Sequence, residues 1–210
     1  MINNNQSGRS MIEMLGVLAI IGVLSVGGIA GYSKAMMKFK INKTIDQISQ
    51  IVANTRTLYA RQKNYGNLSE KVAYKANLAP REMFEGSGYS MTHPFGGEFG
   101  IGSHGLYGFT TDSKAFMVVL NDLPDEACIE LSTQDWGSDT ASGLVGITIT
   151  HASNVNYVLS YSDSDTPYKN CKGTSVTACP NGSINSVPMP VDRAVDACNS
   201  NNNTLVLKFY

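Results

Sequence analysis

The chain has 210 residues, of which 16 are Lys or Arg and 17 are Asp or Glu, so its formal net charge at pH 7 is −1. This balance leaves no basic footprint for nucleic acid at the level of the whole chain. The four cysteines suit an oxidising compartment. The residues after Arg61 are enough for one domain with its own core.

The first element is an apolar run without charges from Met14 to Tyr32, preceded by a single carboxylate at Glu13. About 20 apolar residues are enough for a helix to cross the hydrocarbon core of a bilayer. A carboxylate at that depth is costly unless it lies at the interface, is protonated or meets a cation. We therefore expect Glu13 to have a cationic partner.

Residues 8–32 resemble the N-terminal signature of type IV prepilins, in which a short polar leader ends in glycine and a glutamate stands at the head of an apolar run. Here Gly8 is followed by Arg9 and three further residues before Glu13. The resemblance implies that prepilin peptidase cleaves after Gly8, removes residues 1–8 as a leader and methylates the amine of Arg9. It also implies that Glu13 meets an N-terminal ammonium in the assembling filament.

Two other kinds of segment explain these residues less well. A secretory signal peptide needs a basic start and an apolar stretch of roughly 7 to 15 residues followed by a cleavage site, whereas no Lys or Arg precedes Arg9. A plain membrane anchor gives no reason for Glu13 or for glycines that suit close helix packing. The glycines of the run are Gly16, Gly22, Gly27, Gly28 and Gly31.

Two observations conflict about the orientation in a membrane. The lysines that follow the apolar run would, by a count of Lys and Arg, place that side in the cytoplasm. They are Lys34, Lys38, Lys40 and Lys43. Arg9, which stands where the resembling family usually has Phe or Met, adds positive charge to the new N-terminal amine on the opposite side. With the cysteines, this charge favours a domain outside the cytoplasm.

The helical pattern continues beyond the apolar run as one apolar face. This face consists of Ile41, Ile45, Ile48, Val52, Thr55 and Tyr59. We expect one helix of about 80 Å from Ser10 to Gln62, with residues 9–33 in lipid or in a filament core and residues 34–62 on a sheet. Two helices separated near residues 27–31 are the alternative.

Residues 63–103 carry many turn residues and are expected to connect the helix to a sheet. Within them, the segment His-Pro-Phe-Gly-Gly at 93–97 resembles an Asn-Pro-aromatic-Gly-Gly turn that precedes the first central strand of type IVb pilins. His93 takes the place of the asparagine.

Short segments rich in β-branched or aromatic residues then predict an antiparallel sheet. They are Gly105 to Thr110, Ala115 to Leu120, Leu144 to Thr150, Asn156 to Ser160 and Thr204 to Tyr210. Residues 190–197 have a helical pattern with a proline at the start. This order predicts an α+β fold, in which the long helix packs on the sheet and residues 63–210 form a globular head domain.

Cys128, Cys171, Cys179 and Cys198 allow three disulfide pairings, among which the sequence does not choose. Type IVb pilins have one disulfide between a cysteine after the early strands and one just before the last strand. The resemblance therefore implies that Cys128 pairs with Cys198 and delimits a C-terminal region, leaving Cys171 and Cys179 to close a small surface loop. A zinc site is the alternative, but no Cys-x-x-Cys pair occurs.

Motifs for catalysis, metals or cofactors are missing. His93, His104 and His151 accompany no Gly-x-Ser-x-Gly or His-Glu-x-x-His motif and are expected to be surface or turn histidines. Asp163 and Asp165 lie in a polar segment that lacks the twelve-residue calcium loop and its terminal glutamate. We therefore expect no enzyme, no metal site and no cofactor.

The sequence thus predicts the major subunit of a type IV pilus, most similar to the type IVb group, that polymerises through its N-terminal helix. Its expected partners are other copies of the chain, prepilin peptidase, the assembly platform of the inner membrane and the membrane itself. The head domain would be periplasmic before assembly, and the filament extracellular, where it could serve adhesion, aggregation, motility or DNA transfer. A type II secretion pseudopilin, a minor pilin and an anchored periplasmic enzyme are the alternatives.

Overall fold

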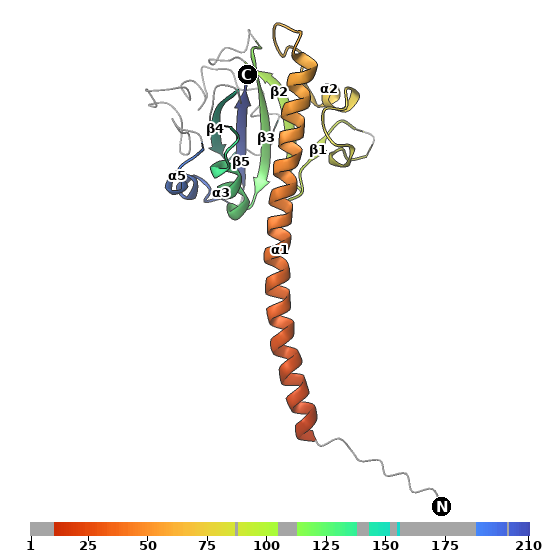
Figure 1. The fold of residues 1–210 in the computed structure, drawn as a ribbon, viewed down its shortest axis with the longest axis vertical. Helices are drawn as coiled ribbons and strands as arrows, with labels where there is room; N and C mark the ends of the chain where they lie inside the picture. The colour runs from red at the N-terminus through yellow and green to blue at the C-terminus, as the bar shows by residue number, and fades with distance from the viewer. Residues whose placement is uncertain are drawn as a thin grey trace, which may run out of the picture. The chain divides into compact units, whose positions relative to one another are not determined.

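The computed structural model describes residues 11–86, 88–104, 113–137, 143–151, 155, 188–200 and 202–210. By its contacts the chain divides into two units, one up to Phe39 and one from Lys40 to Tyr210. Both are drawn in Figure 1. The elements are α1 (Met11–Tyr59), α2 (Glu70–Lys75), the 3-10 helix η1 (Arg81–Met83), β1 (Met91–Thr92), β2 (Glu98–His104), β3 (Ala115–Leu123), α3 (Asp125–Thr133), β4 (Leu144–Thr150), α5 (Val191–Ala197) and β5 (Asn203–Phe209).

The helix α1 is continuous, as the sequence predicts, and ends at Tyr59, three residues before the predicted end at Gln62. No proline occurs between residues 11 and 59 to interrupt it. The glycines near residues 27–31 do not break the helix, so the alternative of two separate helices is wrong.

From Lys40 onward α1 buries one face. The buried side chains of this face are Ile41, Thr44, Gln47, Ile48, Ile51, Val52, Thr55 and Tyr59. They contain five of the six predicted residues, while Ile45 is only half-buried. A ladder of rings connects the end of the helix to the sheet: Tyr59 lies 5.3 Å from Tyr65, and Tyr65 lies 4.8 Å from Phe116, between ring centroids. The head is therefore built on this half of α1.

The five strands form one antiparallel sheet in the order β1-β2-β3-β5-β4. The last strand of the chain lies between β3 and β4, and every residue of β5 is buried. Val118 pairs with Leu207 on one side of β5, and Ile147 pairs with Leu207 on the other. Strand β5 is therefore an interior strand that joins β3 to β4 by hydrogen bonds (Figure 1).

The predicted strands over 115–120, 144–150 and 204–210 are confirmed, with ends that differ by no more than three residues. Two further predicted strands, at 105–110 and 156–160, lie outside the described residues. The predicted helix at 190–197 is confirmed as α5, with Pro190 as its N-cap residue. An α+β fold with a long helix on an antiparallel sheet is therefore confirmed.

The segment 63–103 is more regular than predicted. It contains α2, η1, β1 and most of β2. Strand β2 includes Gly100 and Gly102, residues that are depleted in strands and that hide the alternating pattern. Both glycines are buried beside β3, so tertiary pairing outweighs local propensity here. Helix α3 was also missed, because nine residues are too few for a clear helical period.

The turn predicted at residues 93–97 is present and leads into β2. The His93 carbonyl accepts from the Gly96 amide at 2.8 Å, and the Gly97 carbonyl accepts from the His93 amide at 3.1 Å. Gly96 has a φ of +91°, which favours glycine. A Cβ at position 97 would collide with the Asn121 carbonyl and the His93 ring, so glycine is required there for space.

His93 lies in a turn, as one of the two expectations had it, but its side chain is not at the surface, because it is only 3% exposed. Its Nδ1 accepts from the Phe95 amide at 3.3 Å. The ring proton therefore lies on Nε2, which donates to the Asn121 carbonyl at 2.7 Å. His104 is buried as well, whereas His151 is exposed.

Burial of His93 makes the free energy of unfolding depend on pH. Burial is the main cause that lowers the pKa of this imidazole below its usual value. Below about pH 6.5 the unfolded chain binds a proton that the folded chain does not, so stability is full above that pH and falls as the pH falls through it. We predict that the free energy of unfolding falls less between pH 7.5 and pH 5 in the His93→Asn variant than in the unchanged protein.

Urea unfolding of the detergent-solubilised chain at both pH values measures this difference. His151→Asn removes an exposed histidine and is the matched control, which should keep the pH dependence of the unchanged protein. An identical pH dependence in His93→Asn would show that this imidazole is not the group that titrates.

Candidate functional site

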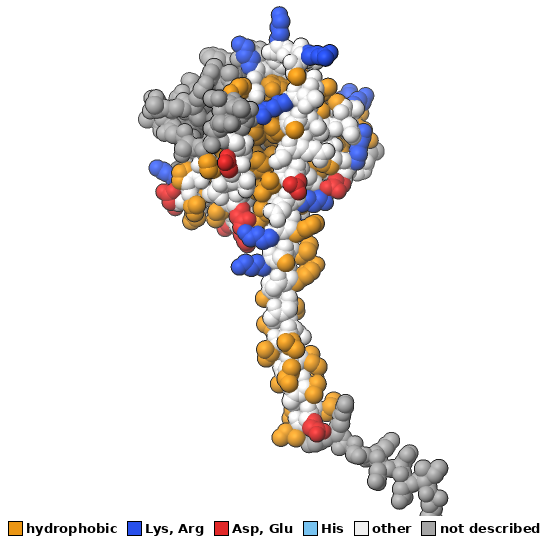
Figure 2. Space-filling view, viewed as in Figure 1, with side chains coloured by type: hydrophobic (Ala, Val, Ile, Leu, Met, Phe, Trp, Pro, Cys, Tyr) orange, Lys and Arg blue, Asp and Glu red, His pale blue; other side chains and the backbone are white. Residues whose placement is uncertain are grey.

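The part of α1 before Lys40 exposes apolar side chains on all sides instead of burying one face. Thirteen large apolar residues between 11 and 32 are from 45% to 82% exposed. They are Met11, Ile12, Met14, Leu15, Val17, Leu18, Ile20, Ile21, Val23, Leu24, Val26, Ile29 and Tyr32. Figure 2 shows apolar side chains along this segment. A helix that is apolar all round belongs in lipid or among other helices.

Charges limit this apolar segment at both ends. Glu13 lies in the first turn of α1, where the helix dipole favours a carboxylate. The next charged residue is Lys34, about 30 Å further along the helix axis. The segment between them matches the thickness of the hydrocarbon core of a bilayer, and α1 is long and apolar enough to cross one.

The glycines of this segment leave its surface open. A Cβ added at Gly16, Gly22, Gly27, Gly28 or Gly31 would meet no atom within 4 Å. Other helices could therefore approach the backbone closely at these positions. Of the residues predicted to act in processing and assembly, the structure describes Glu13, whereas Gly8 and Arg9 lie outside the described residues.

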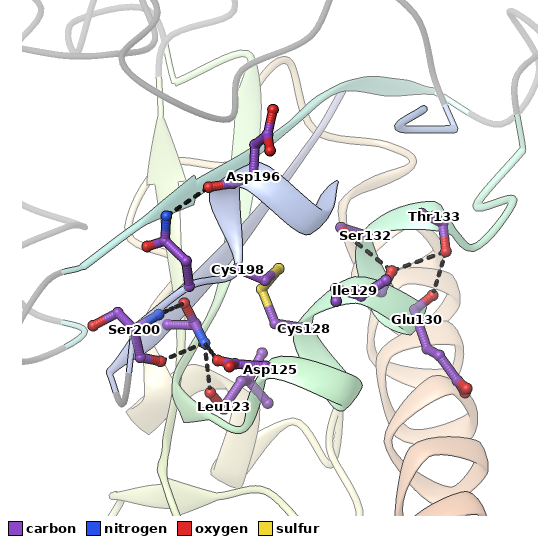
Figure 3. Close-up of a disulfide and its surroundings, with 12 residues drawn as sticks. Leu123, Asp125, Cys128, Ile129, Glu130, Ser132, Thr133, Asp196, Cys198 and Ser200 are labelled. Atoms are coloured by element: carbon purple, nitrogen blue, oxygen red, sulfur yellow. Dashed lines mark hydrogen bonds between the residues drawn. A yellow bond between two sulfur atoms is a disulfide. The ribbon is translucent and has the colours of Figure 1, made fainter. Parts of the chain in front are cut away.

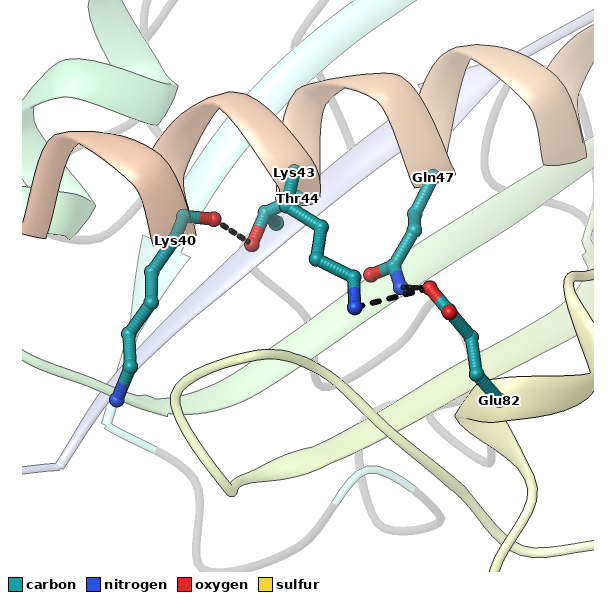
Figure 4. A network of polar contacts seen from close by, with 5 residues as sticks. All are labelled: Lys40, Lys43, Thr44, Gln47 and Glu82. Atoms are coloured by element: carbon teal, nitrogen blue, oxygen red, sulfur yellow. Dashed lines mark hydrogen bonds and ion pairs between the residues drawn. The ribbon is translucent and has the colours of Figure 1, made fainter. Parts of the chain in front are cut away.

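Polar contacts hold the second half of α1 against η1. Lys43 Nζ lies 3.1 Å from Glu82 Oε1, and Gln47 Nε2 donates to the same oxygen at 3.1 Å (Figure 4). The hydrogen bond from Lys43 is the main cause that lowers the pKa of Glu82, followed by the bond from Gln47. The Glu82 side chain is 55% exposed, so the pair contributes at most about 1 kcal/mol. Its effect is to orient η1 on the helix.

Thr44 is satisfied within the helix, because its buried hydroxyl donates to the Lys40 carbonyl at 2.8 Å. The same face of α1 therefore carries polar side chains in the core that hydrophobic periodicity does not reveal. Thr44 and Gln47 are two buried polar side chains of this kind that sequence reasoning missed.

The disulfide between Cys128 and Cys198 is present, which confirms the predicted pairing. It joins the buried face of α3 to the C-cap residue of α5 (Figure 3). The two cysteines are 70 residues apart in sequence, so closing this loop stabilises the fold by about 4 kcal/mol in the loop-entropy model. Cys171 and Cys179 lie outside the described residues.

Asn203 reinforces the same corner. Its Nδ2 donates to the carbonyls of Leu123 and Ser200 at 3.1 and 2.6 Å and contacts Asp125 Oδ1 at 2.8 Å. These bonds tie the start of β5 to the start of α3. Sequence reasoning missed Asn203, because it stands in a run of asparagines with nothing to distinguish it.

Within the ranges that the structure describes, no group of three or more His, Cys, Asp or Glu side chains could hold a metal ion. Trp136 is held by a structural contact, since its Nε1 donates to the Leu131 carbonyl at 2.9 Å. The described features are thus an exposed apolar helix and a head that is closed by a disulfide. The exposed apolar part of α1 can pack against lipid or against other helices.

Comparisons with known proteins agree with this geometry. A family model described as Bundlin matches residues 34–186, which is more than half of the chain. The curated protein "Major structural subunit of bundle-forming pilus" from Escherichia coli O111:H- is 26% identical over 150 residues, covering 71% of this chain and 75% of that protein. The protein of the same name from Escherichia coli O127:H6 (strain E2348/69 / EPEC) has the same identity and coverage.

A solved structure shares the fold. The crystal structure of a type IV pilin from Vibrio cholerae El Tor biotype has a TM-score of 0.52 at 13% identity, covering 81% of this chain and 99% of that one. The family model begins at residue 34, so the N-terminal signature at residues 8–32 is an independent observation.

Proposed function

Because the chain belongs to the Bundlin family of pilins, we propose that it is the major structural subunit of a type IV pilus. It acts by polymerisation and carries out no catalysis. The observation that supports this most is the exposed apolar half of α1, a surface of thirteen large side chains that needs either lipid or identical helices around it. The curated relatives carry the name of a major pilus subunit.

Before assembly, the apolar half of α1 anchors the chain in the inner membrane, with the head in the periplasm. The proposed parts are the leader at 1–8, the membrane and filament-core segment at 9–33, the amphipathic helix at 34–62 and the head at 63–210. The disulfide between Cys128 and Cys198 favours an oxidising location for the head. Prepilin peptidase and the assembly platform of the inner membrane are the proposed partners at this stage.

Glu13 acts when the subunit leaves the membrane. At the membrane interface its carboxylate keeps access to water, but among packed helices it loses water and needs a cation. The amine of a neighbouring Arg9, freed by cleavage after Gly8, supplies that cation. An unpaired carboxylate in the filament core would oppose the docking of each subunit.

Sheared fibres test the proposed function directly. We expect micrometre-long fibres removed from cells by shearing to contain this chain as their main protein. Mass spectrometry should find Arg9 as its first residue, carrying an N-methyl group. A mature chain that begins after residue 25, or fibres that lack the chain, would contradict the proposal.

Substitutions of Glu13 test its role in assembly. We predict that Glu13→Ala and Glu13→Gln are inserted and cleaved normally but give at least about tenfold fewer fibres, because a charge-assisted hydrogen bond contributes about 1.5 to 3 kcal/mol. Glu13→Asp keeps the charge and should assemble in part. Immunoblots of membranes and of sheared fibres measure both stages.

Glu13→Gln is the matched control for size, since it removes the charge and keeps the shape. Abundant normal fibres from Glu13→Ala would show that assembly does not need the carboxylate. Failure of cleavage in all three variants would place Glu13 in peptidase recognition instead.

A further inference from the structure

Two exposed lysines follow the apolar segment of α1. Lys34 and Lys38 are one helical turn apart, so they lie on the same face of the helix. Both belong to the unit that ends at Phe39, before the first residue of the head. We call Lys34 and Lys38 the basic pair. Like charges at this spacing repel each other in an isolated helix, so a bound anion would stabilise the pair.

The next two lysines of α1 have partners within the head. Lys40 Nζ lies 5.7 Å from the centre of the Phe95 ring, and Lys43 pairs with Glu82. The head therefore accounts for Lys40 and Lys43. The position of the basic pair points instead to whatever surrounds the apolar segment.

Aromatic side chains lie on a different face of the same stretch. Tyr32 is 68% exposed and Phe39 is 59% exposed, and a spacing of seven residues places them on one face. This face lies about 130° around the helix from the basic pair. Figure 2 shows basic side chains on one side of α1 beyond its apolar segment and apolar side chains on the other. Rings and lysines at one level of a membrane helix are typical of the interface between hydrocarbon and water.

The length of the helix places this stretch among lipid headgroups. With Glu13 at one edge of the hydrocarbon core, Lys34 lies about 30 Å further along, at the other edge. Lys38 lies about 6 Å beyond Lys34. The headgroup layer extends about 5 to 8 Å outside the core on each side. Both ammonium groups would therefore lie at the level of the lipid phosphates.

The helix carries a net positive charge at this level. On α1 the carboxylates nearest to the basic pair in sequence are Glu13 and Asp46, and Asp46 lies about 12 Å beyond Lys38 along the axis. Anions near a membrane surface are supplied by acidic phospholipids, which attract juxtamembrane lysines. Charge complementarity and continuity with the apolar segment thus indicate the same partner.

We propose that the basic pair binds the phosphate of an anionic phospholipid, in the leaflet on the side of the head, which rests on the proposed function as a pilin with a membrane stage. Tyr32 and Phe39 contact the upper part of neighbouring acyl chains. Each lysine near an anionic surface contributes about a fivefold preference for anionic over zwitterionic lipid.

This role gives a reason for lysines on the periplasmic side. A count of Lys and Arg would place the residues after the apolar segment in the cytoplasm. Binding of the basic pair to anionic headgroups outside the cytoplasm stabilises the opposite placement. The bound lipid is released when the subunit passes from the membrane into a filament.

Photoreactive lipids test the headgroup directly. The full-length processed chain is reconstituted, at low density, in phosphatidylcholine vesicles that carry a trace of phospholipid with a diazirine in its acyl chain. The diazirine lipid is phosphatidylglycerol in one set and phosphatidylcholine in the other, so only the headgroup differs. We expect irradiation to label the unchanged chain at least about fivefold more strongly with phosphatidylglycerol.

Substitutions locate the preference. Lys34→Gln combined with Lys38→Gln should be labelled equally by the two lipids, whereas Lys34→Arg combined with Lys38→Arg should keep the preference, because arginine keeps the charge. Lys63→Gln combined with Lys71→Gln removes the same charge from exposed residues of the head. This matched control should keep the preference as well. An equal loss in the control would overturn the assignment to the basic pair.

The remaining outcomes separate the proposal from the function on which it rests. Equal labelling of an inserted, unchanged chain would overturn the headgroup site and leave the membrane stage intact. A chain that neither lipid labels, and that carbonate strips from the vesicles, would contradict the membrane stage too. Carbodiimide joins amines to carboxylates in contact. Products between two chains through Lys34 or Lys38, without a lipid preference, would show that a second copy is the occupant and overturn the proposal.

Discussion

Apolar surface that must be removed from water is the constraint on which the structure depends. From Lys40 onward, α1 buries a single apolar face, and the five-stranded sheet covers it. Between residues 11 and 32 the same helix is apolar on all sides and exposed. Burying these thirteen side chains is worth on the order of 20 kcal/mol. The chain therefore needs either lipid or other copies around this segment.

Lipid and neighbouring helices are almost equally apolar, so hydrophobic burial does little to favour a filament over the membrane. Specific contacts must supply the difference. The proposed pair between Glu13 and an N-terminal amine is one, and close approach at the open glycines is another. Each favours assembled copies over isolated ones.

The sequence predicts those parts of the molecule that depend on periodicity or on strong local preference. The unbroken α1 and the strands β3, β4 and β5 follow from spacing and β-branched residues, and the pairing of Cys128 with Cys198 came from family resemblance. Strand β2 was missed because Gly100 and Gly102 gain their strand conformation from pairing with β3. Burial of His93 was missed because it depends on the distant Asn121 carbonyl. Contacts between segments far apart in sequence leave no local pattern.

The apolar half of α1 is proposed to have two successive occupants, lipid and then other copies of the chain. A photoreactive benzoylphenylalanine in place of Leu24, which is exposed in the middle of the apolar segment, tests this most directly. Irradiation of sheared fibres should join subunits into dimers and larger products, whereas irradiation of membranes from cells that cannot assemble fibres should label lipid. Fibres in which the chain remains monomeric after irradiation would contradict the account.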